Sequence, residues 1–131
     1  MAYKTPSHRV GAARKAADAL RAARRVVLTT HLNADGDGAG SEVALASWLR
    51  ANGTEAWIIN PTPYPDMFRF LTEDDRVVHA GSKRARTICD TADLAVVVDT
   101  GEVSRIGRVK PLIDSLPCVV IDHHPPGDRP I

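Results

Sequence analysis

The sequence has few cysteines, almost no net charge and no long hydrophobic run. Cys89 and Cys118 are too few and too far apart for a disulfide framework or a zinc knuckle, so we expect reduced, mostly buried thiols. Lys+Arg 17 against Asp+Glu 16 gives a formal net charge of +1, so bulk charge carries no nucleic-acid signature. No apolar run approaches the roughly 18 residues that cross a bilayer, and the N-terminus has no hydrophobic signal-peptide core. We therefore expect a cytoplasmic protein without a membrane partner.

The length and composition fit one globular domain. A chain of 131 residues can bury a real core, and its hydrophobic fraction of 44% is ordinary. The charge is uneven, because basic residues dominate before His31: Lys4, Arg9, Arg14, Lys15, Arg21, Arg24 and Arg25, against Asp18. An anionic partner would explain this excess, but a solvated basic helix face is the interpretation that we favour.

Helical stretches and apolar runs alternate along the chain. We expect helices over residues 10–25, 41–51 and 103–106, and one or two helical turns over 66–71. We expect strands over residues 26–30, 55–60, 94–98 and 118–121, and a weaker one over 76–79. The helix over 41–51 carries an apolar stripe and ends at Asn52-Gly53; the stripe is Ala44, Leu45, Trp48 and Leu49. This alternation predicts an α/β fold with a mainly parallel sheet flanked by helices.

Polar clusters follow three of these apolar runs. His31, Asp35 and Asp37 follow the first, Asp99 ends the run over 94–98, and the triplet 122–124 (Asp-His-His) ends the run over 118–121. In parallel sheets, ligands bind outside the carboxyl ends of the strands. We therefore expect the three clusters to converge, and such a set can hold a pair of divalent cations.

The Gly/Asp-rich segment after His31 admits two main interpretations. It is an exposed turn whose Asp side chains cap backbone N–H groups before Ser41 opens the helix, or it is part of a cation site. Asp35 and Asp37 repel each other when no cation is present, which favours the second interpretation. The interspersed glycines would let the backbone turn tightly around both carboxylates.

Three other phosphate or calcium motifs fit this segment poorly. An EF-hand loop would begin at Asn33, but Ala44 stands where a bidentate Glu is required. The glycines run G-x-G-x-G rather than G-x-G-x-x-G, which argues against a dinucleotide-binding turn. No Walker A sequence occurs.

The two later clusters have chemical uses of their own. A strand-end carboxylate such as Asp99 is often only a turn former, but its two oxygens can also bridge two cations. Adjacent residues of extended backbone point in opposite directions, so one of His123 and His124 can bind metal while the other faces another part of the site. Asp122 could orient a ring N–H.

Taken together, the segments resemble the DHH phosphoesterase superfamily. The resemblance rests on HLNADGDGAGSEVALASWLRANG, NPTPYPDMFRFL, VVVDTGEVSRIG and VVIDHH. It runs from about His31 through His124 and is greatest to the nanoRNase branch (bifunctional oligoribonuclease/phosphoadenosine-phosphate phosphatases) and related cyclic-dinucleotide phosphodiesterases. It implies a DHH-type, Rossmann-like catalytic domain over residues 1–131.

The resemblance also implies roles for individual residues. Two divalent cations, with Mn²⁺ expected, would be held by His31, Asp35, Asp37, Asp99 and His123. Asp99 would bind both ions. His31 and Asp35 would complete the site of one ion, and Asp37 and His123 would complete the site of the other. His124 would contact the scissile phosphate with Asp122 in support. Asn33 and Arg105 would lie toward the substrate, although Arg105 is explained equally well as a surface residue.

The chain departs from the family pattern after the triplet. The family usually has a further Asp ligand and a smaller substrate-recognition domain downstream. Asp128 is too close to the triplet to be our choice for that ligand, and the residues after His124 do not contain the second domain. We expect a truncated catalytic domain rather than a natural short form. The expected substrate is a short oligoribonucleotide or 3′-phosphoadenosine 5′-phosphate. A cyclic dinucleotide is the alternative substrate, and inorganic pyrophosphate or polyphosphate fits the sequence less well. The alternative to an enzyme is a non-catalytic module that binds metal or nucleotide. The oligomeric state is open, with a homodimer as one expectation.

Overall fold

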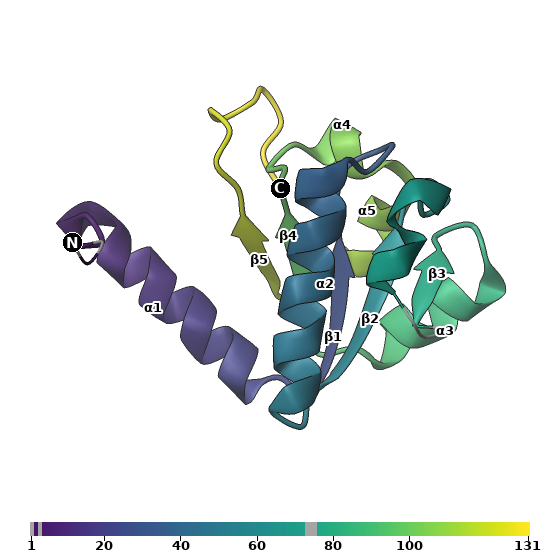
Figure 1. Cartoon of the computed structure of the whole chain (residues 1–131), viewed down its shortest axis with the longest axis horizontal. Coiled ribbons are helices and arrows are strands. Elements are labelled where there is room, and N and C mark those ends of the chain that lie inside the picture. The colour runs from purple at the N-terminus through teal and green to yellow at the C-terminus, as the bar shows by residue number, and fades with distance from the viewer. Residues whose placement is uncertain (1, 3, 73–75) are drawn as a thin grey trace.

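A parallel sheet forms the centre of the molecule (Figure 1). The computed structural model describes residue 2, residues 4–72 and residues 76–131. The strands are β1 (Arg25–Thr29), β2 (Glu55–Asn60), β3 (Val77–His79), β4 (Leu94–Val98) and β5 (Cys118–Ile121). Their order is β3-β2-β1-β4-β5, and every neighbouring pair is parallel. The predicted α/β class with a parallel sheet is confirmed.

The chain reverses its direction across the sheet between β1 and β4. From β1 it proceeds to β2 and β3, and it then returns to the other side of β1 to form β4 and β5. In open α/β sheets, such a switch point is where ligands bind, outside the carboxyl ends of the strands. Thr29 of β1 is in register with Val97 of β4. The segments that follow β1 and β4 therefore leave the sheet side by side.

Helices cover both faces of the sheet (Figure 1). Helix α2 (Gly36–Ala51) lies on one face, where Val26 and Leu28 of β1 pack in one core cluster with its Leu49. The intervening Val27 packs on the other face, in a cluster that includes Ile88. The elements on that face are α3 (Lys83–Thr91), α4 (Val103–Ile106), the 3₁₀ turn η2 (Gly107–Val109) and α5 (Lys110–Ile113). Alternate side chains of one strand thus build two cores.

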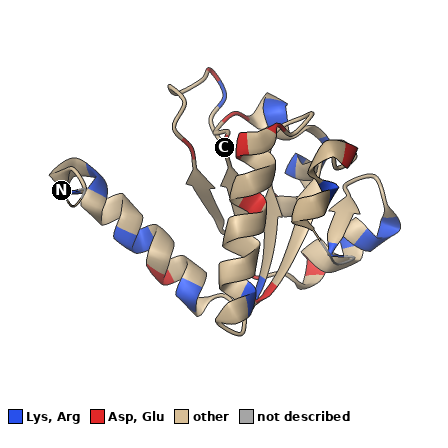
Figure 2. Ribbon diagram, viewed as in Figure 1, with Lys and Arg blue, Asp and Glu red and all other residues tan. Residues whose placement is uncertain are grey.

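Helix α1 (Ser7–Ala22) extends away from the sheet (Figure 1). Leu20 is its one buried residue, and Figure 2 shows Lys and Arg spread along its exposed length. Arg9, Arg14, Lys15 and Arg21 lie exposed on this helix, whereas Arg25 is part of β1 and pairs with Glu55. Within the described part of the chain, no helix is both long and apolar enough to cross a bilayer.

Several predicted boundaries agree with the structure, and others do not. The strands β2, β4 and β5, the 3₁₀ helix η1 (Asp66–Leu71) and α4 match the expected ranges. Helix α1 ends earlier than predicted because Arg25 already pairs with Glu55 in the sheet. Helix α3 was not predicted at all. Cys89 is buried as expected, but Cys118 is exposed because β5 is an edge strand.

Helix α2 differs most from its prediction. It begins at Gly36 rather than at Ser41, and its buried face is Gly38, Ala39, Glu42, Ala46 and Leu49. Trp48, placed in the buried stripe from the sequence, is 43% exposed. The small residues allow the helix to approach the sheet closely, so Ala39 and Ala46 face inward, whereas Ala44 and Trp48 of the predicted stripe are exposed. This rotation also buries Glu42 beneath the end of the sheet.

Candidate metal centre

Asp35 fixes the start of helix α2 at the carboxyl end of β1. Its Oδ1 accepts hydrogen bonds from the backbone N–H groups of Asp37 (3.1 Å) and Gly38 (3.0 Å). The Gly38 bond is the largest cause of a lowered pKa for Asp35, and the charge of nearby His31 adds to it, against some desolvation. The capping predicted for the Asp-rich segment is therefore present, and it holds this carboxylate ionised 3.6 Å from His31 Nε2.

Asp37 lies on the first turn of the same helix and faces a different histidine. Its Oδ1 accepts a long hydrogen bond (3.4 Å) from the Ser41 hydroxyl. Its Oδ2 lies 3.3 Å from His123 Nε2, on the loop after β5. Because the helix cap places Asp35 and Asp37 two residues apart at a helix start, the two carboxylates point toward separate imidazoles.

Asp99 occupies the centre of the cluster. It follows β4 with φ of 61°, a left-handed backbone that is uncommon outside glycine and more accessible to Asp and Asn than to most residues. Its backbone N–H donates to the Ile121 carbonyl of the neighbouring strand at 2.9 Å. Its side chain is only 4% exposed. One oxygen, Oδ2, lies 3.4 Å from His31 Nε2, and the other, Oδ1, lies 3.0 Å from His123 Nε2.

His124 points toward a different partner from His123. Its Nδ1 lies 2.6 Å from Asp122 Oδ1, and its backbone N–H also donates to that oxygen. The hydrogen bond to Asp122 is the main cause of a raised pKa for His124. For Asp122, partial desolvation opposes the shift, but the hydrogen bonds and charge of His124 hold its pKa below the ordinary value. Asp122 and the His124 imidazole are therefore in direct contact.

The three sequence clusters converge at the switch point of the sheet. His31, Asp35 and Asp99 each bring one ligand atom within 4.8 Å of the others. Asp99, Asp122, His123 and His124 do the same, and Asp37 lies beside this second group. Asp99 therefore belongs to both groups and offers a different oxygen to each histidine. Mixed carboxylate and imidazole donors suit a divalent ion such as Mn²⁺ or Zn²⁺.

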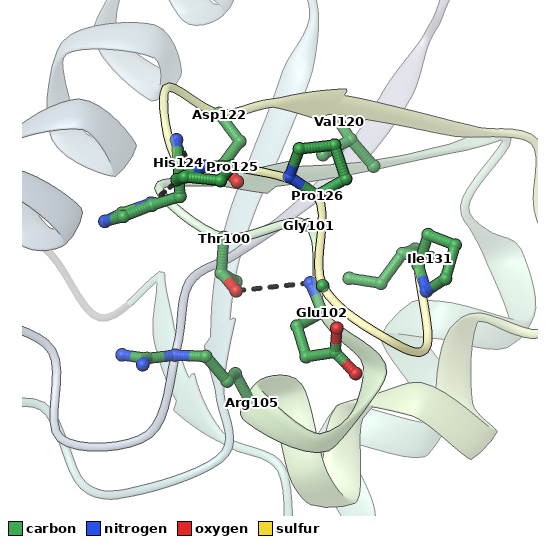
Figure 3. Close-up of a pocket in the computed structure, with 12 residues that line it drawn as sticks. Thr100, Gly101, Glu102, Arg105, Val120, Asp122, His124, Pro125, Pro126 and Ile131 are labelled. Atoms are coloured by element: carbon green, nitrogen blue, oxygen red, sulfur yellow. Dashed lines mark hydrogen bonds and ion pairs between the residues drawn. The ribbon is translucent and has the colours of Figure 1, made fainter.

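The two residues expected to face the substrate lie on the loop after β1 and on α4. Asn33 has φ of 53°, and its backbone N–H donates to the Thr62 hydroxyl at 2.9 Å. The Arg105 carbonyl accepts a hydrogen bond from Leu32 N–H at 2.7 Å, which anchors α4 beside the loop after β1. In Figure 3 the side chains of Arg105 and His124 extend toward the same side, and the charge of Arg105 acts on the His124 imidazole.

The sequence interpretation missed a buried polar network behind the cluster. Glu42 is fully buried, and its Oε2 accepts a hydrogen bond from Asn60 Nδ2 at 3.0 Å. Asn60 Oδ1 accepts from Thr30 N–H at 3.3 Å, and the Thr30 hydroxyl donates to the Val98 carbonyl at 2.9 Å. Thr30 and Val98 each immediately precede a residue of the cluster. A Glu in phase with Ala46 and Leu49 was the sequence signal that could have revealed this network.

The glycines of the segment do not form a tight turn, and one of them, Gly38, serves close packing. Gly36, Gly38 and Gly40 all lie inside α2, and none has a left-handed backbone. A Cβ at Gly38 would lie 2.6 Å from Thr30 Oγ1, whereas a Cβ at Gly40 would meet nothing within 4 Å. The early helix start also excludes an EF-hand loop, since residues 36–44 are helical.

Replacement of Gly38 by Ala should destabilise the domain. We expect a loss of about 1–3 kcal/mol in the free energy of unfolding, because the buried Thr30 hydroxyl cannot turn away without losing its bond to Val98. Gly40→Ala in the same helix should instead raise stability by about 0.5–1 kcal/mol. Urea unfolding of both variants with EDTA present is the measurement. Equal effects of the two substitutions would contradict the proposed contact.

Comparisons with known proteins agree on one family and one fold. The model of the DHH family, N-terminal domain, matches residues 25–131. A solved structure described as an exopolyphosphatase-related protein from Bacteroides fragilis is similar to this chain, with a TM-score of 0.79 and 22% sequence identity. The similarity covers 90% of this chain but 36% of that protein, so the present chain spans about a third of its length. A likeness at this level of identity shows a shared fold.

Proposed function

The chain belongs to the DHH family, and from this premise we propose that its domain hydrolyses phosphoester bonds with the help of divalent cations. The observation that carries the proposal is the position of Asp99, whose two carboxylate oxygens face different histidines, His31 and His123. A carboxylate that serves two cations presents its oxygens in this way. The remaining donors divide accordingly, since Asp35 lies by His31 and Asp37 lies by His123.

The proposed ligand set is therefore His31, Asp35, Asp37, Asp99 and His123. When bound, a pair of cations would neutralise charge on the phosphate and lower the pKa of a coordinated water. Mn²⁺ is the ion that we propose, on the mixed oxygen and nitrogen donor set. The nearly buried Asp99 is backed by a strand hydrogen bond, so this central ligand is held in place before any ion arrives.

His124 and Asp122 are the proposed catalytic pair. Because Asp122 engages Nδ1 of His124, the other ring nitrogen is left for the phosphate. The raised pKa of His124 favours the protonated ring, which donates a hydrogen bond to an anionic oxygen. Arg105 supplies a second positive charge on the same side, and Asn33, on the loop after β1, is a further proposed substrate contact.

The proposed substrates are short oligoribonucleotides or 3′-phosphoadenosine 5′-phosphate, as in the nanoRNase branch that the sequence resembles. A cyclic dinucleotide is the second candidate, and a non-catalytic binding module is the third. We further propose that substrate selection involves a second domain outside these residues, because the similar solved protein is much longer than this chain.

Metal removal tests the proposed function directly. A dinucleotide, phosphoadenosine phosphate, a cyclic dinucleotide and pyrophosphate should be assayed side by side with Mn²⁺, with EDTA, and with Mn²⁺ restored. We expect hydrolysis of at least one phosphoester to vanish with EDTA and to return with Mn²⁺. Turnover that persists after chelation would contradict the proposal, and Mn²⁺ binding without turnover would favour the non-catalytic module.

A further inference from the structure

A pocket of about 460 Å³ adjoins the candidate metal centre (Figure 3). Its floor is the loop after β4, residues 100–102, and one wall is the end of β5. The chain after His124 forms the opposite wall and returns to the sheet. The volume lies within the roughly 300–1,000 Å³ that is typical of small-molecule sites.

Backbone hydrogen bonds close this wall. The Val103 N–H donates to the Arg129 carbonyl, and the Ile131 N–H donates to the Gly101 carbonyl, both at 2.9 Å. The Arg129 N–H donates to the Glu102 carboxylate at 3.1 and 3.2 Å. Ile131 also packs against the core cluster on the α3 face of the sheet. The wall is therefore held against the loop after β4 by backbone hydrogen bonds.

The pocket opens onto the groups proposed to act on phosphate. Asp122 and His124 line it, and Arg105 lies across from them (Figure 3). Thr100, in its floor, directly follows the shared carboxylate Asp99. A phosphate placed at the metal centre would therefore extend its remaining substituent into this pocket.

The residues that line the pocket indicate which kind of substituent would bind there. The apolar lining residues are Val120, Pro125, Pro126, Pro130 and Ile131. Among the lining residues, the charged groups are the carboxylates of Glu102 and Asp122 and the single guanidinium of Arg105, with His124 at the mouth. Beyond Arg105 and His124, a further phosphate group would meet the Glu102 carboxylate and apolar side chains rather than cationic groups. A flat organic group with hydrogen-bond donors fits, because Glu102 and the Thr100 hydroxyl offer acceptor oxygens.

We propose that this pocket binds the nucleoside portion of the substrate, next to the phosphate on the metal centre. The inference rests on the proposed phosphoesterase function and narrows it, because it favours nucleotide substrates over inorganic polyphosphate. Glu102 would accept hydrogen bonds from ribose hydroxyls or base amino groups, and the proline-rich wall would cover the base.

Adenosine tests the pocket without metal and without catalysis. In EDTA, titration of the 131-residue chain with adenosine should shift amide NMR signals of residues 100–102, 120–122, 127–129 and 131, with a dissociation constant in the millimolar range. Tripolyphosphate should neither shift these signals nor displace adenosine. Absence of shifts at saturating adenosine, shifts confined to other residues, or displacement by tripolyphosphate would overturn the proposal.

A variant whose side chain fills the pocket provides a second test of the proposal. Val120→Trp places a large ring in the cavity and should weaken adenosine binding at least tenfold, while Ala12→Trp on the exposed surface of α1 should leave it unchanged. Mn²⁺ titration of the same Val120→Trp protein should match the wild type. Unchanged adenosine affinity in a folded Val120→Trp protein would contradict the assignment. A chain that binds adenosine here but never hydrolyses a phosphoester would refute only the proposed function.

Discussion

Asp99→Asn is expected to lower Mn²⁺-dependent phosphoester hydrolysis on the order of 10³-fold and to weaken Mn²⁺ binding in parallel. The substitution keeps the shape of the side chain but replaces one oxygen by an NH₂ group, which cannot bind a cation. Because the two oxygens of Asp99 face His31 and His123, one proposed cation position loses its ligand oxygen, and the other keeps only a neutral amide oxygen, so both positions are weakened at once. Asp35→Asn and Asp37→Asn each affect one position and should have smaller effects on Mn²⁺ affinity.

The backbone of Asp99 makes Asn the informative replacement. At φ of 61°, Asn is tolerated nearly as well as Asp, whereas Ala would add about 1–2 kcal/mol of backbone strain. Asp99→Asn should therefore keep the thermal stability of the metal-free protein, so that a loss of activity reports on ligation. Asp18→Asn, on the exposed face of α1, is the matched control. Calorimetric Mn²⁺ affinity and turnover within tenfold of the wild type would refute the shared-ligand assignment.

The carboxyl-end cluster could be predicted because strong local signals surround each of its residues. Five apolar residues precede Asp99, and four precede Asp122, so the strand ends were fixed by composition. The parallel pairing of β1 with β4 and of β4 with β5 then brought these ends together. The convergence of the polar clusters could be predicted from the alternation of helices and strands, and not from any single motif.

The buried face of α2 could not be predicted from apolar periodicity. This helix is built largely from Ala, Gly and Ser, so its inner and outer positions have similar hydrophobicity. The contact with Thr30 decides the rotation, because Gly38 is the position that permits close approach. The sequence analysis placed Trp48 on the buried face because it used hydrophobicity alone. Hydrophobicity does not show how closely the helix approaches the sheet.

Helix α3 and the position of Cys118 were missed for different reasons. Helix α3 buries Ala85, Ile88 and Cys89, which are spaced i, i+3 and i+4, and Ser82 caps its N-terminus. This local signal for an amphipathic helix was present in the sequence and was overlooked. The apolar strand β5 was expected to be buried, yet it forms the sheet edge because strand order is a property of the whole chain.

The second large expected effect concerns Glu42 and the stability of the folded protein. Burial raises the pKa of Glu42 to about 8 against a hydrogen bond from Asn60 that lowers it. The ordinary value in the unfolded chain is 4.5. Between these values the folded protein binds one more proton than the unfolded chain does, so the free energy of unfolding falls as pH rises from about 4.5 to 8. The loss attributable to this group is on the order of 5 kcal/mol across that window.

Glu42→Gln should remove this pH dependence. The amide oxygen of Gln can still accept from Asn60 Nδ2, and its NH₂ group does not ionise. Among the described residues, Glu42 Oε1 and Tyr64 Oη are buried without hydrogen-bond partners, and the electrostatic effect of Glu42 on the Tyr64 pKa places the two groups near each other. A Gln NH₂ group is a donor in that region. The variant should therefore equal the wild type near pH 5 and exceed it in stability by several kcal/mol at pH 8.

The difference between the two proteins isolates this single group, because all other titrating residues are common to both. Urea unfolding at pH 5, 6, 7 and 8, with EDTA present to remove metal linkage, measures it. Glu55→Gln is the control, since hydrogen bonds from Trp57 and Arg25 lower the pKa of the partly exposed Glu55. The stabilising effect of Glu55 is complete above pH 4.5 and is lost only as the pH falls below that value, so its difference from wild type should stay constant between pH 6 and 8. A Glu42→Gln difference that is equally constant would mean that Glu42 is ionised in the folded protein, and the buried network would then need a cation or water that neutralises it.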